Sequence, residues 1–405
     1  MVSPVMPALT GNGLSMRTGL FLEALARIAD VELLVVPPFG HASREGDTWA
    51  TQASARVRVL DCAVQDTHFG LIARLTDPST RLDAFAKYGK PSISGTISAA
   101  TTRKASNLLR GERFDLVHVE RSYCAPLGCA IGTLGNGAPV LTIDLDEDDS
   151  RLYTTLAGLA VKMERSDEVR WNLLEATAFR RLLDDTLPLF NRIWVSSAVD
   201  LASLASSASS VEAHILPNSV ITARRVRLRD DGRTLLFVGS LGYAPNQDAV
   251  SWFLSAIWPR LSKARNLRFQ IVGPNAPPDL RRRARQRGVE MLGWVPDPAC
   301  YYATATLTIV PIRAGAGTRI KLIESAFFGV PSVSTAVGAE GLGLRNGQHL
   351  WMADTAKTFV EAVHDALDRP AERQRRAHAA RAQVTAALDR ETTVRRLSRE
   401  FLTLL

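Results

Sequence analysis

Two positively charged side chains stand where a helix is expected to begin in the second half of the chain. The segment 311–318 ends a buried strand and contains two glycines, which let the backbone approach a ligand closely, and Thr318 is placed to cap a helix over 319–328. Arg319 and Lys321 fall in the first turn of this helix, where the helix dipole makes positive charge unfavourable. An anion bound at the helix start would relieve this conflict, and a diphosphate fits that need.

A carboxylate follows within the same expected helix. Glu324 comes three residues after Lys321 and therefore lies on nearly the same helix face. The two oxygens of a carboxylate match the two hydroxyls of a vicinal diol, so Glu324 could hold a ribose next to the diphosphate. The alternative is an exposed Lys-Glu pair that binds no ligand.

A second glycine-containing turn joins the first expected strand to the first expected helix. Gly11, Asn12 and Gly13 form this turn. Glycines at such a place permit close approach to a phosphate, although a plain turn from strand to helix would need them equally. Two such loops, one in each half of the chain, suit a diphosphate bound between two domains.

An acidic run follows another expected strand in the first half of the chain. It has no glycine at the turn and no EF-hand spacing, so we expect a solvated loop or a helix start and no metal site. Its members are Asp144, Asp146, Glu147, Asp148 and Asp149.

The elements that position these residues alternate between short apolar strands and amphipathic helices. In the first half we predict helices over 14–28 and, as one long or broken helix, over 151–190. Strands are predicted at 2–7, 31–36, 57–60, 116–119, 140–144 and 192–196.

The pattern changes around 211–233, where a polar, basic stretch that comes after Val220 and ends at 230–233 is the best candidate for a linker. A second alternation of strands and helices follows it. Helices are predicted over 246–262, 278–287 and 319–328, and strands at 234–239, 269–273, 289–292, 307–311 and 332–335. We therefore predict an α/β protein with two tandem Rossmann-like domains that face each other across a cleft. The expected domains are 1–220 and 221–385, with a C-terminal helix over 386–405 that packs back toward the first domain.

Composition is typical of a globular protein with two domains: 405 residues, of which 46% are hydrophobic and 22% charged. No apolar stretch approaches the roughly 18 residues of a membrane span. The first residues do not have the pattern of a signal peptide, and the four cysteines form no CxxC pair. We expect a cytoplasmic protein without a disulfide framework or a zinc site.

The net charge of +8 is unevenly distributed. Residues 1–220 hold 21 basic and 25 acidic side chains, a net charge of −4, whereas residues 221–405 hold 28 basic and 16 acidic ones, a net charge of +12. Much of the excess consists of arginines at helical spacing, which predicts solvated helix faces and no nucleic-acid partner.

The order of several motifs resembles one family, the retaining glycosyltransferases of family 4, formerly called glycosyl transferases group 1. These enzymes have two Rossmann-like domains in the arrangement known as the GT-B fold. The stretches that carry the resemblance are 115–120, 216–220, 237–249, 293–297, 315–324, 329–335 and 338–342.

The resemblance implies a nucleotide-sugar donor and assigns residues to it. Glu324 matches a glutamate that binds the ribose, Arg319 and Lys321 match basic residues that hold the diphosphate, and Trp294 with Val295 matches a loop that reads the nucleobase. The other residues expected to bind the donor are Gly11, Asn12, Gly13, Gly239, Ser240, Asn246, Gly315, Ala316, Gly317 and Thr318.

The chain also departs from the family pattern. Ala316 stands where many members have a glutamate that contacts the donor sugar, and Ser240 stands where many have an arginine. Arg319 and Lys321 would then be the residues that bind the phosphates in place of that arginine. Many family members carry a histidine at the position that corresponds to Glu120. His118, two residues earlier, makes this alignment ambiguous.

We expect Glu120 to lie at the carboxyl end of its strand and to act in catalysis together with Arg319 and Lys321. It could orient an acceptor hydroxyl or stabilise charge on the sugar; the alternative is a simple ion pair with Arg121 or a distant cation. His118 and Tyr123 are expected on the acceptor side.

The resemblance implies a retaining transfer of a sugar to an acceptor hydroxyl, with a UDP-sugar as the first guess for the donor and no metal requirement. We favour a soluble acceptor of the secondary-metabolite type. A lipid-linked acceptor of envelope or exopolysaccharide assembly is the alternative, because residues 56–113 hold 10 basic and 5 acidic side chains and could contact a membrane peripherally. A nucleotide-binding scaffold or regulatory subunit with weak catalysis is the alternative from another class.

Overall fold

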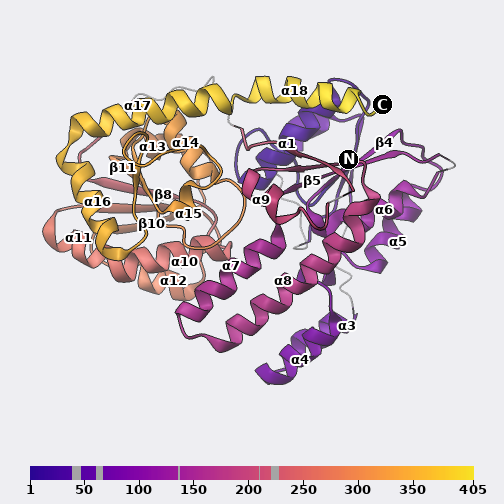
Figure 1. Cartoon of the computed structure of the whole chain (residues 1–405), viewed down its shortest axis with the longest axis horizontal. Coiled ribbons are helices and arrows are strands. Elements are labelled where there is room, and N and C mark those ends of the chain that lie inside the picture. The colour runs from indigo at the N-terminus through magenta and orange to yellow at the C-terminus, as the bar shows by residue number, and fades with distance from the viewer. Residues whose placement is uncertain (39–46, 61–66, 136, 209, 220–227) are drawn as a thin grey trace. The chain divides into compact units, whose positions relative to one another are not determined.

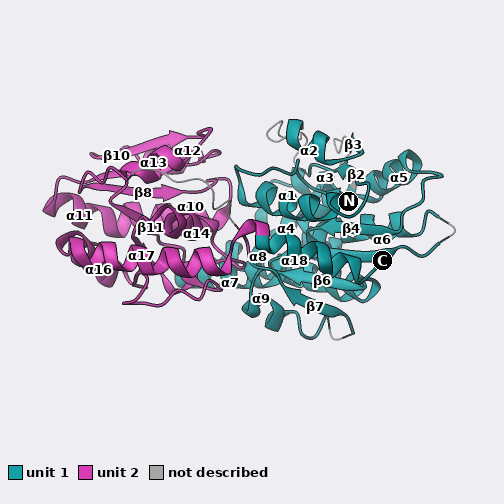
Figure 2. Cartoon of the chain, turned by 90° about the horizontal axis from the view of Figure 1, so that it is seen from above, with its two compact units in different colours: residues 1–217, 392–405 teal, residues 218–391 magenta. Residues whose placement is uncertain are grey.

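The computed structural model describes residues 1–38, 47–60, 67–135, 137–208, 210–219 and 228–405 (Figure 1). The chain forms two compact units, coloured separately in Figure 2: unit 1 comprises Met1–Pro217 and Thr392–Leu405, and unit 2 comprises Asn218–Glu391. The division lies close to the predicted boundary between residues 220 and 221, which itself falls outside the described residues.

Unit 1 is built on a sheet of seven parallel strands in the order β3-β2-β1-β4-β5-β6-β7. The order 3-2-1-4-5-6 is that of a dinucleotide-binding Rossmann sheet, and β7 extends it. The strands are β1 (Val2–Ser3), β2 (Glu32–Val35), β3 (Arg56–Val59), β4 (Leu116–Glu120), β5 (Val140–Asp146), β6 (Arg192–Val195) and β7 (Glu212–Ile215). Strand β7 was not predicted, because its residues lie where the sequence pattern changes ahead of the linker candidate.

Helices connect these strands (Figure 1). The predicted helix over 151–190 is broken into α7 and α8, which are separated by a turn at 163–165. The helices of unit 1 are α1 (Gly13–Ala26), α2 (Asp47–Ala53), α3 (Thr67–Arg74), α4 (Pro78–Tyr88), α5 (Ala99–Leu108), α6 (Ala125–Gly132), α7 (Asp149–Lys162), α8 (Ser166–Thr186) and α9 (Ala198–Ser203), with 3-10 turns at Ser92–Gly95, Ser122–Cys124 and Leu187–Leu189.

Unit 2 repeats the same plan with six parallel strands in the order β10-β9-β8-β11-β12-β13. The strands are β8 (Thr234–Val238), β9 (Arg268–Val272), β10 (Val289–Gly293), β11 (Leu307–Val310), β12 (Ser332–Ser334) and β13 (Trp351–Met352). Only β13 is absent from the predicted strands. At two residues it is too short to give a periodic signal.

The helices of unit 2 include one departure from regular geometry. The predicted helix over 246–262 contains a π-helical turn, Phe253–Ile257, between α10 and α11. The helices are α10 (Ala244–Trp252), α11 (Trp258–Ala264), α12 (Pro278–Arg283), α13 (Ala299–Thr304), α14 (Ile320–Phe328), α15 (Ala336–Ala339), α16 (Ala356–Asp368) and α17 (Pro370–Ala387).

The last helix, α18 (Arg390–Leu402), returns the chain to unit 1. Its apolar side chains Val394, Leu397 and Phe401 are fully buried in the same core cluster as Phe21 and Trp194. The Phe401 and Trp194 rings lie 5.1 Å apart between centroids. None of the helices in the described part of the chain is long and apolar enough to cross a membrane.

Candidate functional site

Arg319 presents an unpaired donor at the start of α14. Its Nη1 donates hydrogen bonds to the carbonyl oxygens of Ala316 and Gly317, the second over 2.7 Å. Its Nη2 is buried and has no hydrogen-bond partner within the described residues, and only 8% of the residue is exposed. Gly315, at φ 139°, makes room for this group, because a Cβ at that position would lie 2.9 Å from Nη2. A guanidinium held in this way is suited to bind an anion.

Lys321 lies in the first turn of α14 and is held by a neutral partner. Its Nζ donates a hydrogen bond of 3.0 Å to Oδ1 of Asn246, whose Nδ2 donates in turn to the Ser240 carbonyl over 2.8 Å. Burial and the charge of Arg319, opposed by that of Glu324, lower the pKa of Lys321 to about 7. An anion would restore the charge of this lysine, since no carboxylate in the described part of the chain lies within ion-pair distance of it.

Glycine at 239 allows this lysine to pass close to the backbone. Gly239 has φ 156°, and a Cβ there would lie 2.9 Å from Asn246 Nδ2 and 3.1 Å from Lys321 Cε. The side chain of Lys321 also passes over the Phe237 ring, with Nζ 5.4 Å from its centroid. The predicted donor residues Gly239, Ser240, Asn246 and Lys321 therefore lie together.

Glu324 lies one turn further along α14 and has a partner that the sequence analysis missed. The Tyr302 hydroxyl donates to Glu324 Oε2 over 3.1 Å and also contacts the Lys321 carbonyl oxygen at 3.3 Å. Burial raises the pKa of Glu324 to about 7, against the opposing effects of this hydrogen bond and of Lys321. The alternative of an exposed Lys-Glu pair is wrong, because both groups are largely desolvated. A buried tyrosine in an apolar helix was the available signal, since its hydroxyl needs a partner.

Thr318 does not cap α14 as predicted. The residue at the N-cap position is Arg319, and its side chain makes no capping hydrogen bond. Thr318 Oγ1 instead accepts a hydrogen bond of 2.9 Å from Asn218 Nδ2. The helix therefore begins one residue later than the sequence pattern suggests, which leaves the first amide groups of α14 without a side-chain cap.

The segment expected to read a nucleobase follows strand β10. Trp294 is 56% exposed, unusually so for a tryptophan, and Val295 is half-buried. Both residues come after the carboxyl end of a parallel strand, the edge at which ligands of such sheets bind. Their role toward a base stays a prediction.

In unit 1, the glycine turn stands at the start of α1. Asn12 is the N-cap, and its Oδ1 accepts a hydrogen bond of 3.0 Å from the Ser15 amide. Gly11 and Asn12 are exposed, and Gly13 is the first helical residue. Asn12 thus has a capping role in the described structure, and contact of this turn with a phosphate stays a prediction.

Glu120 ends β4 as predicted, and it is completely buried. Its Oε1 lies 3.1 Å from His118 Nε2, while His118 Nδ1 lies 2.9 Å from Thr142 Oγ1 and the imidazole stacks on Phe21. Burial raises the pKa of Glu120 to about 8 and lowers that of His118 to about 3, so both are neutral near pH 7. Tyr123 is buried in the core of unit 1.

The acidic run of unit 1 is a helix start, as expected, but the expectation of a solvated loop is wrong. Asp148 is the N-cap of α7, and the carboxylates around it are buried and paired with arginines. The carboxylates of this run are buried because the run follows a central strand of the sheet, where other elements cover it. Arg121 Nη2 lies 2.9 Å from Glu147, and Arg180 Nη2 lies 3.0 Å from Asp148. Within the described ranges, no group of three His, Cys, Asp or Glu side chains could hold a metal ion.

The sequence analysis also missed a buried ion pair. Arg17 of α1 makes two hydrogen bonds to Asp144, of 2.5 and 2.7 Å, and a third of 2.9 Å to the Leu216 carbonyl oxygen. The feature of the sequence that could have predicted this pair is a lone arginine on an otherwise apolar face of the helix. The pair fixes α1 to the end of β5.

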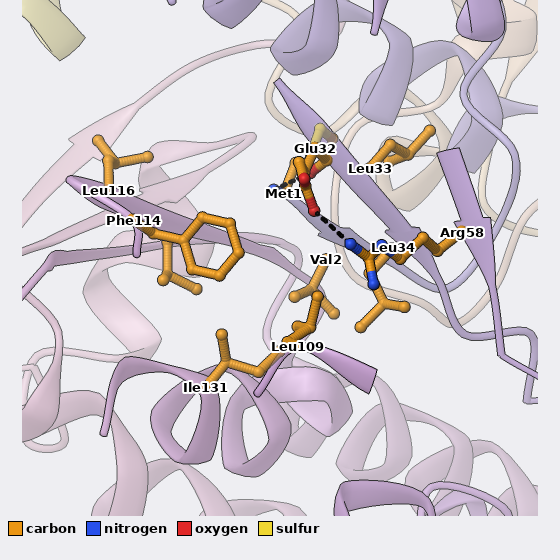
Figure 3. Close-up of a pocket in the computed structure, with 11 residues that line it drawn as sticks. Met1, Val2, Glu32, Leu33, Leu34, Arg58, Leu109, Phe114, Leu116 and Ile131 are labelled. Atoms are coloured by element: carbon orange, nitrogen blue, oxygen red, sulfur yellow. Dashed lines mark hydrogen bonds and ion pairs between the residues drawn. The ribbon is translucent and has the colours of Figure 1, made fainter. Parts of the chain in front are cut away.

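Unit 1 contains a pocket lined mainly by apolar side chains (Figure 3). Val2, Leu109 and Ile131 line it, together with Glu32 and Arg58, whose carboxylate and guanidinium are 3.5 Å apart. It lies where β2 and β4 begin, whereas ligands of parallel sheets bind outside the carboxyl ends of the strands. We therefore place the candidate site at α14.

Comparison with known families identifies the segment that carries this site. Residues 232–369 match the family described as glycosyl transferases group 1. This range contains β8 to β13 and all of the residues gathered around α14 apart from Asn218. A search of curated protein sequences finds no match.

Solved structures resemble the whole chain. Sucrose-phosphate synthase from Thermosynechococcus elongatus is 13% identical, with 100% of this chain and 98% of that chain covered and a TM-score of 0.70. HepE from Anabaena, in complex with UDP and glucose, is 12% identical, with 100% and 99% covered and a TM-score of 0.67. TarM from S. aureus is 10% identical, with 75% and 58% covered and a TM-score of 0.59.

These similarities confirm the predicted fold, an α/β protein with two tandem Rossmann-like domains. They also support the expected class of enzyme, since the matched family consists of glycosyl transferases. Residues 232–369 thus match the glycosyl transferases group 1, and the chain has the GT-B fold over its whole length.

Proposed function

We propose that this glycosyltransferase moves a sugar from a nucleoside diphosphate sugar to an acceptor hydroxyl, with retention of the anomeric configuration. The observation that carries the proposal is the pair of cations at the start of α14. Arg319 has a buried Nη2 without a partner in the described part of the chain, and Lys321 is held by the neutral Asn246. A diphosphate would supply the charge that both groups lack.

Each residue around α14 then has a role in the reaction. Arg319 and Lys321 bind the diphosphate and stabilise the charge that develops on it as the glycosidic bond breaks. Glu324 accepts hydrogen bonds from the ribose hydroxyls, and Trp294 with Val295 lies beside the base. Because protein cations neutralise the diphosphate, we expect activity to persist in the presence of EDTA.

A UDP-sugar is the donor we propose first. HepE, which shares the fold, was solved with UDP and with UDP-glucose. For the acceptor we propose a soluble hydroxyl compound, with a lipid-linked acceptor as the alternative. Salt-sensitive binding to anionic vesicles would favour the lipid-linked acceptor.

In unit 1, a catalytic role for Glu120 stays part of the proposal. Its burial and its hydrogen bond to His118 mean that the carboxyl group would act as a neutral donor in the described structure. A substrate would have to reach the buried carboxyl before it could act on an acceptor.

The test is calorimetric titration of the protein with UDP, ADP, GDP and their glucose conjugates, followed by detection of donor hydrolysis and transfer. We expect one nucleoside diphosphate to bind and Arg319→Ala to weaken its binding about 10- to 100-fold, since a charge-assisted hydrogen bond is lost. The matched control is Arg285→Ala, because Arg285 is exposed at the end of α12.

Binding without turnover of any donor would favour the nucleotide-binding scaffold. Equal binding by wild type and Arg319→Ala would overturn the assignment of the site. The anomeric configuration of the product, measured by proton NMR, tests retention.

A further inference from the structure

The hydroxyl of Tyr302 joins two parts of the candidate site. It lies 3.1 Å from Glu324 Oε2 and 3.3 Å from the backbone carbonyl oxygen of Lys321. A phenolic hydroxyl has one proton, and both of these neighbours are acceptors, so the hydroxyl donates toward the carboxylate and the carbonyl. Burial raises the pKa of Tyr302 well above its ordinary value, which keeps that proton in place.

The ring that carries this hydroxyl is firmly held. Tyr302 is fully buried in an apolar cluster with Leu236, Val272 and Val330. Its ring lies 5.0 Å from that of Phe328, between centroids, and Phe328 belongs to the same helix as Glu324. The hydroxyl position is therefore set by packing between α13 and α14 and not by the carboxylate it contacts.

The contact leaves Glu324 free to bind a diol. Oε2 uses one of its acceptor positions on Tyr302, and Oε1 makes no hydrogen bond to the described residues. Each oxygen can therefore still accept one hydroxyl proton, which is what bidentate binding of a vicinal diol requires.

We infer that Tyr302 is a positioning residue, which holds the Glu324 carboxylate in the orientation that binds the ribose diol of the donor. The inference rests on the proposed function, because it takes Glu324 to be the ribose ligand. Tyr302 itself does not contact the donor. It acts by restricting rotation of a carboxylate that would otherwise have no fixed partner, and by stabilising the ionised form.

The charged groups around Glu324 determine the direction of a pH effect. Lys321 from α14 and the Tyr302 hydroxyl lower the pKa of Glu324, whereas burial and the charge of Asp297, which precedes α13, raise it. Without the Tyr302 hydroxyl, one of the two favourable effects disappears and the pKa of Glu324 rises. Protonation would then extend further into the neutral range.

The experiment compares wild type with Tyr302→Phe, which keeps the ring and removes only the hydroxyl. The probes are UDP, or whichever nucleoside diphosphate binds wild type best, and its 2′,3′-dideoxy analogue, which has no diol. We expect the variant to bind the complete nucleotide about tenfold more weakly and the dideoxy analogue almost as well as wild type does. The acid limb of the affinity profile should shift to higher pH.

Tyr301→Phe is the matched control, because Tyr301 is the neighbouring tyrosine on α13 and its hydroxyl makes no hydrogen bond to Glu324. Equal loss of affinity for both probes would show a general structural defect and overturn the inference, as would unchanged affinity for the complete nucleotide. If wild type binds no nucleoside diphosphate, the proposed function fails. If wild type binds the two probes equally well, Glu324 is not a ribose ligand, and the inference fails while the diphosphate site stands.

Discussion

In each unit, one central strand has many charged side chains at or after its carboxyl end. The two units differ in whether these charges form ion pairs with other side chains. At the end of β5 of unit 1, arginines pair with carboxylates: the buried Arg17 holds Asp144 through two hydrogen bonds, and the largely buried Arg121 lies 2.9 Å from Glu147. After β11 of unit 2, Arg319 and Lys321 are bonded to neutral oxygens, and neither makes an ion pair within the described residues.

The difference distinguishes structural charges from functional ones. A buried charge is costly unless it is compensated, and in unit 1 the protein supplies the compensation itself. In unit 2 no carboxylate of the described residues makes an ion pair with either cation, and burial together with the charge of Arg319 lowers the pKa of Lys321. A ligand anion bound there would form with these cations the ion pairs that the described side chains of the unit do not form.

The largest effect is expected from breaking the pair of unit 1. Asp144→Ala would remove the carboxylate that accepts two hydrogen bonds from the buried Arg17 guanidinium, while Asp146 stays at 3.5 Å, and we expect a loss of about 3–5 kcal/mol in the free energy of unfolding. Urea denaturation followed by circular dichroism measures it. The exposed Asp83, paired with Arg170, provides the control, because Asp83→Ala should leave the unfolding midpoint unchanged.

The double variant Arg17→Met with Asp144→Leu gives a second measurement on the same pair. Removal of both charges leaves no buried guanidinium without its main partner, and Asp146 keeps its ion pair with Arg121, so this variant should recover much of the stability that Asp144→Ala loses. A double variant as unstable as the single one would mean that the pair is not the source of the loss.

Lys321→Ala should lower activity without a comparable loss of stability. We expect transfer or donor hydrolysis to fall about 10²–10³-fold, the usual cost of losing one group that stabilises developing negative charge. Lys263 is exposed on α11, so Lys263→Ala serves as the control. Full activity of Lys321→Ala would remove the distinction between the two units, because the cation of unit 2 would then have no function.

The pH dependence of donor binding gives the smallest and most specific effect. The pKa of Lys321 is about 7 in the free protein, so above that pH binding must restore a proton to the amine. Affinity for the nucleoside diphosphate should therefore fall as pH rises, by at most about tenfold per pH unit. In Lys321→Arg the charge persists, and this basic limb should disappear. A basic limb unchanged in the arginine variant would assign the titration to another group.

Much of the architecture was predictable because local patterns determine it. Most strands among β1 to β6 and β8 to β12 contain apolar stretches that are buried in a parallel sheet, whereas the edge strands β3 and β10 are only partly buried. Strands β7 and β13 were missed, since a short edge strand is defined by its pairing partner more than by its own residues. The start of α14 was predicted one residue early, because the Thr318 hydroxyl bonds to Asn218, which is a hundred residues away.

The sequence by itself determined the two Rossmann-like units. It also determined that Lys321 and Glu324 lie on one face of α14, because side chains three residues apart share a helix face, and that Arg319 stands at the start of this helix. Only the tertiary structure decided which charges are paired and which are not. Arg17 and Asp144 are 127 residues apart, and Glu324 and Tyr302 are 22 apart. Burial and pairing depend on distances in space between segments distant in the chain, and these distances arise only when the sheets and helices pack.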